Sequence, residues 1–198
     1  MRLAALPLLL SASLIGQTAL AGKDKADYAV LLGASPFGGS VNFSYTPKKK
    51  TSWNVAIGRG PDWISSTATI DNVEYDLKAK SAWGAVLWNH RPVKDADWFR
   101  VAAGLAIGRI DGTIEETGGD NKYAAAYVEQ PALYTGVGFG NKPVKGFVYG
   151  FDIGVLTTGG PSIVQTDGTG ADQSDALADD WRFGSVLPNF QLTVGWGF

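Results

Sequence analysis

The sequence predicts an all-β fold: a single antiparallel transmembrane β-barrel, most simply of eight strands, after a cleaved signal peptide. Three observations predict it. Apolar residues alternate with small or polar ones along most of the chain, which is the period-2 pattern of a β-strand. The connections between these segments alternate between short and long, as in outer-membrane barrels. Glycine recurs on the smaller face of segment after segment, which leaves room for opposing side chains inside a narrow cylinder.

Composition excludes several function classes. The 198 residues include 17 basic and 19 acidic ones, one histidine and no cysteine, for a formal charge of −2. A nucleic-acid partner is not expected, because binding phosphates needs a basic surface. The absence of cysteine excludes disulfides, thiol nucleophiles and iron–sulfur clusters, and a single histidine excludes a multi-histidine metal centre. We therefore expect no cofactor and no resident metal.

Residues 1–21 are predicted to be a signal peptide. Arg2 is the only charge, residues 3–15 are apolar, and Ala19-Leu20-Ala21 has the small-residue pattern of a cleavage site. The apolar run is too short to span a bilayer as a helix and contains Pro7. Residues 22–198 then form one domain, the barrel itself.

The last strand shows the alternation best. One face is bulky and is expected to contact lipid; it comprises Phe190, Leu192, Val194, Trp196 and Phe198. The other face is polar or glycine, as suits a crowded lumen. In a soluble lipocalin-like barrel, the alternative fold, the bulky side chains would instead fill the interior.

Connections set the strand count. Seven strands are predicted at residues 39–46, 52–59, 73–88, 98–110, 125–140, 146–157 and 182–198. The short connections are 46–52, 89–97 and 141–146, and the long polar ones are 60–73, 111–122 and 159–180. If the domain starts and ends on the short side, the strand number is even, so an eighth strand is predicted at residues 28–34, turning through Ser35-Pro36-Phe37-Gly38.

Aromatic residues near the short connections are expected to form an interfacial girdle. They are Phe43, Tyr45, Trp53, Phe99, Phe139, Phe147, Trp196 and Phe198.

Three segments carry a family resemblance: Leu133-Tyr134-Thr135-Gly136-Val137-Gly138-Phe139-Gly140-Asn141, Asp152-Ile153-Gly154 and the strand from Pro188 to Phe198. With them the chain resembles small proteobacterial outer-membrane barrels of the outer-membrane-protein-W and -A type, in an uncharacterised branch. The resemblance implies the outer membrane of a Gram-negative bacterium, with its lipid and lipopolysaccharide as partners. It also implies that the barrel-assembly machinery reads the alternating hydrophobic ending that closes on Phe198.

Charged residues are predicted inside the lumen. In the 73–88 segment, Val73, Tyr75, Leu77 and Ala79 alternate with charged residues. The predicted lumen charges are Glu74, Asp76, Lys78, Lys80, Arg100 and Asp152. Such charges must pair, because an isolated buried ion is very costly. Our hypothesis is that Asp152 pairs with Lys80 or Lys78 in a structural plug, the alternative being a gate or proton path.

Two other features suggest chemistry. His90 could serve a lipid A-modifying enzyme, but it falls in a short turn on the periplasmic side, so no enzyme is expected. The long connections are acidic and could hold divalent cations through carboxylate oxygens, although such charge usually only solvates a loop.

The leading hypothesis is therefore a non-enzymatic barrel with a side-chain-filled lumen and a structural or surface-interaction role. The alternative, implied by the resemblance to outer membrane protein W, is a narrow barrel that passes a small hydrophobic ligand through an apolar outer funnel. Trp63, Ile64, Ile110 and Ile114 could contribute to that funnel.

Overall fold

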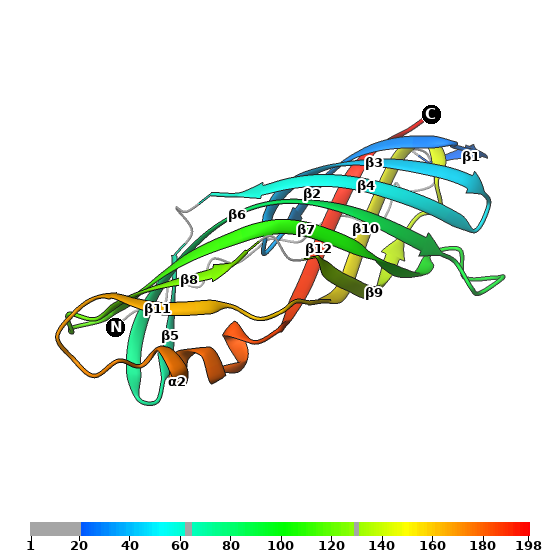
Figure 1. Cartoon of the computed structure of the whole chain (residues 1–198). Helices are drawn as coiled ribbons and strands as arrows, with labels where there is room; N and C mark the ends of the chain where they lie inside the picture. Colours follow the sequence, from blue (N-terminus) through cyan, green and yellow to red (C-terminus); the bar gives the residue numbers. More distant parts are fainter. Residues whose placement is uncertain (1–20, 62–64, 129–130) are drawn as a thin grey trace.

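Eight strands close into a ring in the computed structural model, which describes residues 21–61, 65–128 and 131–198, with side chains from Asp24 onward (Figure 1). They pair antiparallel in the order β2-β3-β4-β6-β7-β9-β10-β12 and back to β2. The predicted barrel and its eight strands are confirmed. The ring strands are β2 Tyr28–Ser35, β3 Gly38–Lys48, β4 Thr51–Gly60, β6 Val73–His90, β7 Phe99–Glu116, β9 Ala132–Gly140, β10 Val144–Thr157 and β12 Val186–Gly197.

The remaining elements lie at the two ends of the ring. A short strand, β1 (Ala21–Lys25), pairs with the start of β10. The others are β5 Ser65–Ile70, β8 Lys122–Tyr127, β11 Ser162–Asp167, the helix α2 Ser174–Asp179 and the 3₁₀ turn η1 Trp181–Phe183. The β3–β4, β6–β7 and β9–β10 connections define what we call the short-turn end, near which the C-terminus lies (Figure 1).

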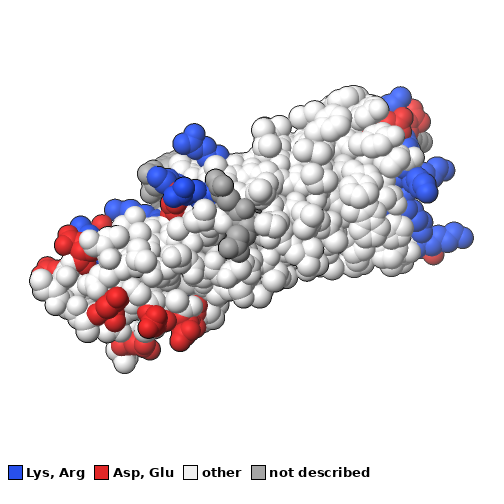
Figure 2. Space-filling view, in the orientation of Figure 1, with Lys and Arg blue, Asp and Glu red and all other residues white. Residues whose placement is uncertain are grey.

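Side chains alternate between the two faces of the wall as predicted. Ile57, Leu105 and Leu192 are about 60% exposed on the outside, whereas Asn42 and Gln191 are buried inside. On the face that Figure 2 shows, a belt free of charged residues lies between two charged ends. Water would make so much exposed apolar surface unfavourable, and hydrocarbon would not. In the described part of the chain, no helix has the length and hydrophobicity to cross a membrane.

Aromatic rings surround the short-turn end, where the girdle is expected. Tyr28 stacks on Phe43 and Tyr45 at centroid distances of 5.8 and 5.3 Å, and on Phe198 at 6.4 Å. On the opposite arc, Trp98, Phe99 and Phe139 contact one another. Such rings hold a barrel at the depth where lipid head groups begin.

The long connections were expected to be loops, and this expectation is wrong. At the end opposite the short turns, β6 and β7 remain paired beyond the ring. There β5, β8 and β11 add to their edges, in the order β5-β6-β7-β8-β11. We call this sheet, with α2 and η1, the extension. The predicted strand 125–140 is accordingly two strands, β8 and β9, and the predicted strand 182–198 begins with η1.

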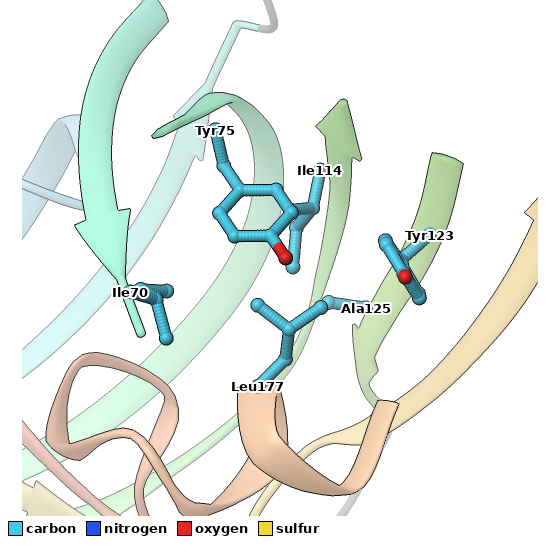
Figure 3. Close-up of a cluster of buried hydrophobic side chains, with 6 residues drawn as sticks. All are labelled: Ile70, Tyr75, Ile114, Tyr123, Ala125 and Leu177. Atoms are coloured by element: carbon cyan, nitrogen blue, oxygen red, sulfur yellow. The ribbon is translucent and has the colours of Figure 1, made fainter. Parts of the chain in front are cut away.

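A small hydrophobic core explains why the extension is ordered (Figure 3). Its buried members are Ile70, Tyr75, Ile114, Tyr123, Ala125 and Leu177. Leu177, from α2, is fully buried among side chains of the sheet. Arg182 of η1 donates from Nη1 to the carbonyl oxygen of Thr69 in β5 at 3.2 Å. The α2–η1 segment therefore joins the two outer edges of the extension.

We expect Leu177→Ala to loosen the extension without unfolding the barrel. Removing a fully buried leucine side chain costs about 2–5 kcal/mol, and here the loss falls on α2. Limited proteolysis in detergent should show faster cleavage within residues 168–185 while the barrel still migrates as a folded species. Asp175→Ala, an exposed change in the same helix, is the control. Equal cleavage of the two variants would show that Leu177 does not hold α2.

Candidate functional site

The lumen has a polar half toward the short-turn end. Its inward positions carry small or polar side chains because the bulky member of each alternating pair faces outward. The buried polar residues of this half are Ser40, Asn42, Ser44, Ser52, Asn89, Arg91, Asp152, Gln191 and Thr193. An eight-stranded barrel has an interior just wide enough for such side chains to fill.

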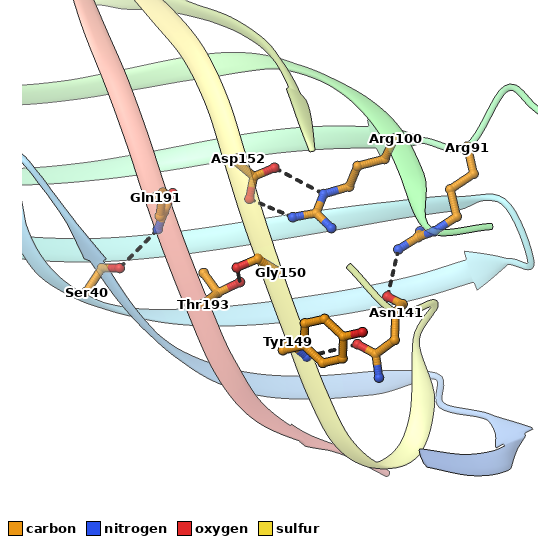
Figure 4. Close-up of polar contacts among 9 residues, drawn as sticks. All are labelled: Ser40, Arg91, Arg100, Asn141, Tyr149, Gly150, Asp152, Gln191 and Thr193. Atoms are coloured by element: carbon orange, nitrogen blue, oxygen red, sulfur yellow. Dashed lines mark hydrogen bonds and ion pairs between the residues drawn. The ribbon is translucent and has the colours of Figure 1, made fainter. Parts of the chain in front are cut away.

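An Arg–Asp pair lies at the centre of this half (Figure 4). Arg100 of β7 donates from Nε to Asp152 Oδ1 at 3.1 Å and from Nη2 to Oδ2 at 2.6 Å. The two side chains are only 11% and 12% exposed. A bidentate contact satisfies both carboxylate oxygens and is among the stronger side-chain pairings in proteins.

Glycine on the intervening strand makes the pair possible. Arg100 and Asp152 both stand opposite Gly138 of β9 in the strand register. A methyl group at Gly138 would collide with the Asp152 carboxylate and lie 2.6 Å from Arg100 Nε. A methyl group at Gly150 would lie 2.8 Å from Arg100 Nη2. The inward glycines therefore supply space, as the sequence suggests.

The predicted pairing of Asp152 with Lys80 or Lys78 is wrong, since Arg100 occupies that position. Lys78 and Lys80 are exposed, as are Glu74 and Asp76, and all four belong to the part of β6 beyond the ring. The inward residues of β6 are the odd-numbered ones throughout, and Tyr75 packs in the extension core. The charged face there meets water, so its charges need no buried partners.

Further hydrogen bonds lie beside the ion pair in the lumen. Ser40 Oγ accepts from Asn42 Nδ2 at 3.0 Å and from Gln191 Nε2 at 3.3 Å. Thr193 Oγ1 donates to the carbonyl oxygen of Gly150 at 3.3 Å. These bonds connect β3, β10 and β12 at about the level of the ion pair (Figure 4).

Arg91 closes the short-turn end, a role that sequence reasoning missed. It directly follows β6, and its side chain donates from Nε to Asp97 O at 2.9 Å and from Nη2 to Asn141 O at 3.4 Å. Burial and the nearby Arg100 lower its pKa to about 10, so the guanidinium stays charged at neutral pH. The period-2 alternation offered a signal, because Arg91 lies two residues after inward-facing Asn89 and therefore falls on the same face.

The half of the lumen toward the extension is apolar. A cavity of about 100 Å³ is lined there by residues that include Trp83, Leu87, Tyr134, Leu156 and Leu187. Trp83 closes one side and donates from Nε1 to Phe37 O at 3.0 Å. A cavity of this character can admit a small hydrophobic molecule.

The predicted funnel residues divide among three places. Ile110 lines the apolar cavity, whereas Ile114 is buried in the extension core. Trp63 and Ile64 lie outside the described residues. Tyr127 also lines the cavity; burial raises its pKa to about 12, and its hydroxyl donates to Gly184 O at 3.3 Å.

His90 belongs to the outer surface at the short-turn end. Its Nδ1 lies 3.1 Å from Thr51 Oγ1, and its ring stacks on Trp88 with an interplanar angle of 2°. These contacts are those of a girdle residue.

The acidic residues of the extension form no evident cation site. Hydrogen bonds from Ser174 lower the pKa of the Asp172 carboxyl. Among all described residues, no group of three or more His, Asp or Glu is arranged to hold a metal ion.

The class that this geometry defines is the eight-stranded antiparallel β-barrel with an apolar outer belt. Neither a protein-family model nor a curated protein matches the chain. Among solved structures, CarO of Acinetobacter baumannii matches with a TM-score of 0.67 and 17% identity, covering 87% of this chain and 98% of CarO. CarO2 of Acinetobacter baumannii matches with a TM-score of 0.68 and 18% identity, covering 88% of this chain and 100% of CarO2. At this identity the likeness shows the fold, and the resemblance to outer-membrane proteins W and A stays a prediction.

The Arg100–Asp152 pair should behave as a unit in unfolding experiments. Arg100→Met and Asp152→Asn should each cost about 3–5 kcal/mol, because each leaves a buried charge without its partner. The double variant should cost clearly less than the sum, which urea unfolding in detergent micelles measures. The matched control pairs Asp152→Asn with Lys80→Met, for which additive effects are expected. Additivity of the Arg100 and Asp152 changes would contradict the pairing.

Proposed function

We propose that the chain is an integral outer-membrane barrel whose filled lumen does not conduct, with a structural or surface-interaction role. The charge-free belt and the aromatic rings suit a bilayer, and the CarO proteins that share the fold are outer-membrane β-barrels. The short turns would face the periplasm and the extension the outside, where lipopolysaccharide surrounds it. In this arrangement His90 has no substrate-facing position, so we propose no enzymatic role.

One observation carries this proposal: the bidentate Arg100–Asp152 pair lies across the polar half of the lumen, in a ring whose interior is just wide enough for side chains. Arg91 closes the periplasmic side below it through backbone carbonyls of two connections. An ion passing through would have to displace both guanidinium groups.

The C-terminal strand supports outer-membrane assembly. Phe190, Leu192, Val194, Trp196 and Phe198 all project outward and are at least half exposed. Their alternate apolar side chains are thus accessible to the assembly machinery that the resemblance implies. Tyr28 N donates to Phe198 O, and Phe198 N donates to Tyr28 O, so the last residue also closes the ring.

We expect the purified, folded protein to be silent in planar-bilayer conductance measurements. The triple variant Arg91→Ala/Arg100→Ala/Asp152→Ala should show discrete steps, because it removes the ion pair and the Arg91 closure together without leaving an unpaired charge. Lys80→Ala, an exposed change in β6, should remain silent. Circular dichroism and heat-modifiable gel mobility establish that each variant is folded. Discrete steps from the unaltered protein would overturn the proposal and make transport the leading function.

The second candidate function is passage of a small hydrophobic molecule, and the apolar cavity favours it. The β7–β9 ladder ends at Ala106 and the β7–β8 ladder begins at Ile110. Ile107, which faces outward and is 58% exposed, nevertheless lines this cavity together with inward residues of β6. A ligand there would lie close to the lipid face of the wall.

A water-soluble apolar probe such as cyclohexanol tests this candidate. We expect saturable shifts of the Leu156 and Leu187 methyl resonances in NMR spectra, because both side chains line the cavity. Ala106→Phe should fill the cavity and abolish the shifts. Ala103→Phe, on the outward face of the same strand, should leave them intact. Shifts that rise linearly, or that survive Ala106→Phe, would exclude the cavity as the binding place.

A further inference from the structure

We propose that the polar half of the lumen binds a small monovalent inorganic anion, of the size of chloride, between Arg91 and Asn89. The place is a second cavity of about 50 Å³, which shares Leu87, Tyr134 and Gln191 with the lining of the apolar one. That volume accommodates a halide ion with an accompanying water, and it excludes a phosphate-bearing head group.

The charge balance points to an anion. The ionisable side chains among the described residues lining this cavity include two arginines, Arg91 and Arg100, and one carboxylate, Asp152. Arg100 already has a counter-charge, because its Nε and Nη2 both donate to the Asp152 carboxylate. Arg91 is bonded only to neutral backbone carbonyls, at Asp97 and Asn141. One positive charge is therefore buried without a bonded counter-charge.

Asp97 attracts Arg91 electrostatically, but its carboxylate makes no direct contact with the Arg91 guanidinium. Asp97 offers Arg91 its backbone oxygen, while its side chain is half exposed and lies 3.7 Å from Lys142 Nζ. A charge left in this position is costly, since a buried ion is tolerated only when it is paired. A small anion from solution, bound in the polar cavity, would supply the missing partner of Arg91.

Unpaired donors point to the same place. Among the described residues, Arg91 Nη1 and Asn89 Nδ2 are buried side-chain donors that have no hydrogen-bond partner. Arg91 is 4% exposed and Asn89 2% exposed, and both line the cavity. Two unpaired buried donors beside an excess positive charge are the arrangement that an anion satisfies.

The strand register adds neighbouring hydroxyl groups. Ser52 stands opposite Asn89, and Ser44 stands opposite Asn54. Both serines are buried and line the cavity. Their hydroxyls can turn toward an anion, and the remaining unpaired atom, Asn54 Oδ1, is an acceptor that an accompanying water can satisfy.

Anion-dependent stability tests the proposal on the purified protein in detergent. Urea unfolding is followed at constant ionic strength while sodium chloride replaces sodium gluconate, whose anion is too large for the cavity. We expect a saturable effect, in which the unfolding equilibrium constant falls about tenfold when free chloride is about ten times its dissociation constant. A site filled by water alone would show no saturable chloride effect, and that result would overturn the proposal.

Variants locate the effect. Arg91→Gln should abolish the chloride dependence, whereas Lys142→Gln, which removes the same charge from an exposed position nearby, should keep it. Asn89→Asp should also abolish it, by placing a fixed carboxylate where the anion would bind, and should stabilise the protein in gluconate. A chloride effect that survives both Arg91→Gln and Asn89→Asp would place the ion elsewhere and contradict the proposal.

Crystallography gives an answer that does not depend on how the variants fold. Crystals of the unaltered protein grown in sodium bromide should show an anomalous peak within hydrogen-bond distance of Arg91 Nη1 and Asn89 Nδ2. Absence of that peak would overturn the site. A conducting barrel would overturn the closed lumen proposed above, but it would leave this peak and its stability effect as separate observations.

Discussion

The narrowness of an eight-stranded ring is the constraint on which the rest of this structure depends. With a lumen only as wide as a few side chains, large residues must face outward, and positions opposite a large inward residue must be small. Gly138 and Gly150 meet this demand beside Arg100, and Gly58 meets it beside Trp83. The alternation that puts apolar residues toward lipid is thus also the alternation that makes the lumen fillable.

The same narrowness determines how charged side chains inside the lumen are balanced. A wide barrel could hydrate its inward ions, but a filled one must pair them by direct contact. Asp152 does this for Arg100, two strands away across a glycine. Arg91 instead finds backbone carbonyls, which satisfy hydrogen bonds but not charge. The charge of Arg100 is therefore balanced by direct contact, while Arg91, which lines the polar cavity, has no bonded carboxylate.

Much of the barrel could be predicted from the sequence, because period-2 alternation is a local property that survives folding. It was sufficient for seven of the eight ring strands and for the inward direction of Asp152 and Arg100, whereas β2 was predicted from the even strand number that the connections require. The partner of Asp152 could not be predicted, since it depends on register across β9, which is set by pairings between distant segments. Arg91 was missed because it lies in a connection, past the end of the alternating segment that places Asn89 inward.

The extension shows the limit of alternation more sharply. In the first part of β6, one face carries Tyr75 and Leu77 and the other carries charges, so the pattern fits a strand in lipid with a charged lumen. It fits equally a strand in water with an apolar interior, and the structure has the second arrangement. Only the core partner Leu177, a hundred residues away on α2, decides between them.

The two halves of the lumen differ because their surroundings do. Near the short-turn end, inward polar groups form hydrogen bonds with one another, and a few buried polar atoms remain without a partner. Toward the extension, the cavity lining is mostly apolar, and among the described residues none of the buried side-chain atoms without a hydrogen-bond partner belongs to it. An apolar cavity can remain dry or take an apolar guest, whereas a polar one must hold water or an ion. One barrel can for this reason combine a polar half suited to water or an ion with an apolar half that has room for a small molecule toward the extension.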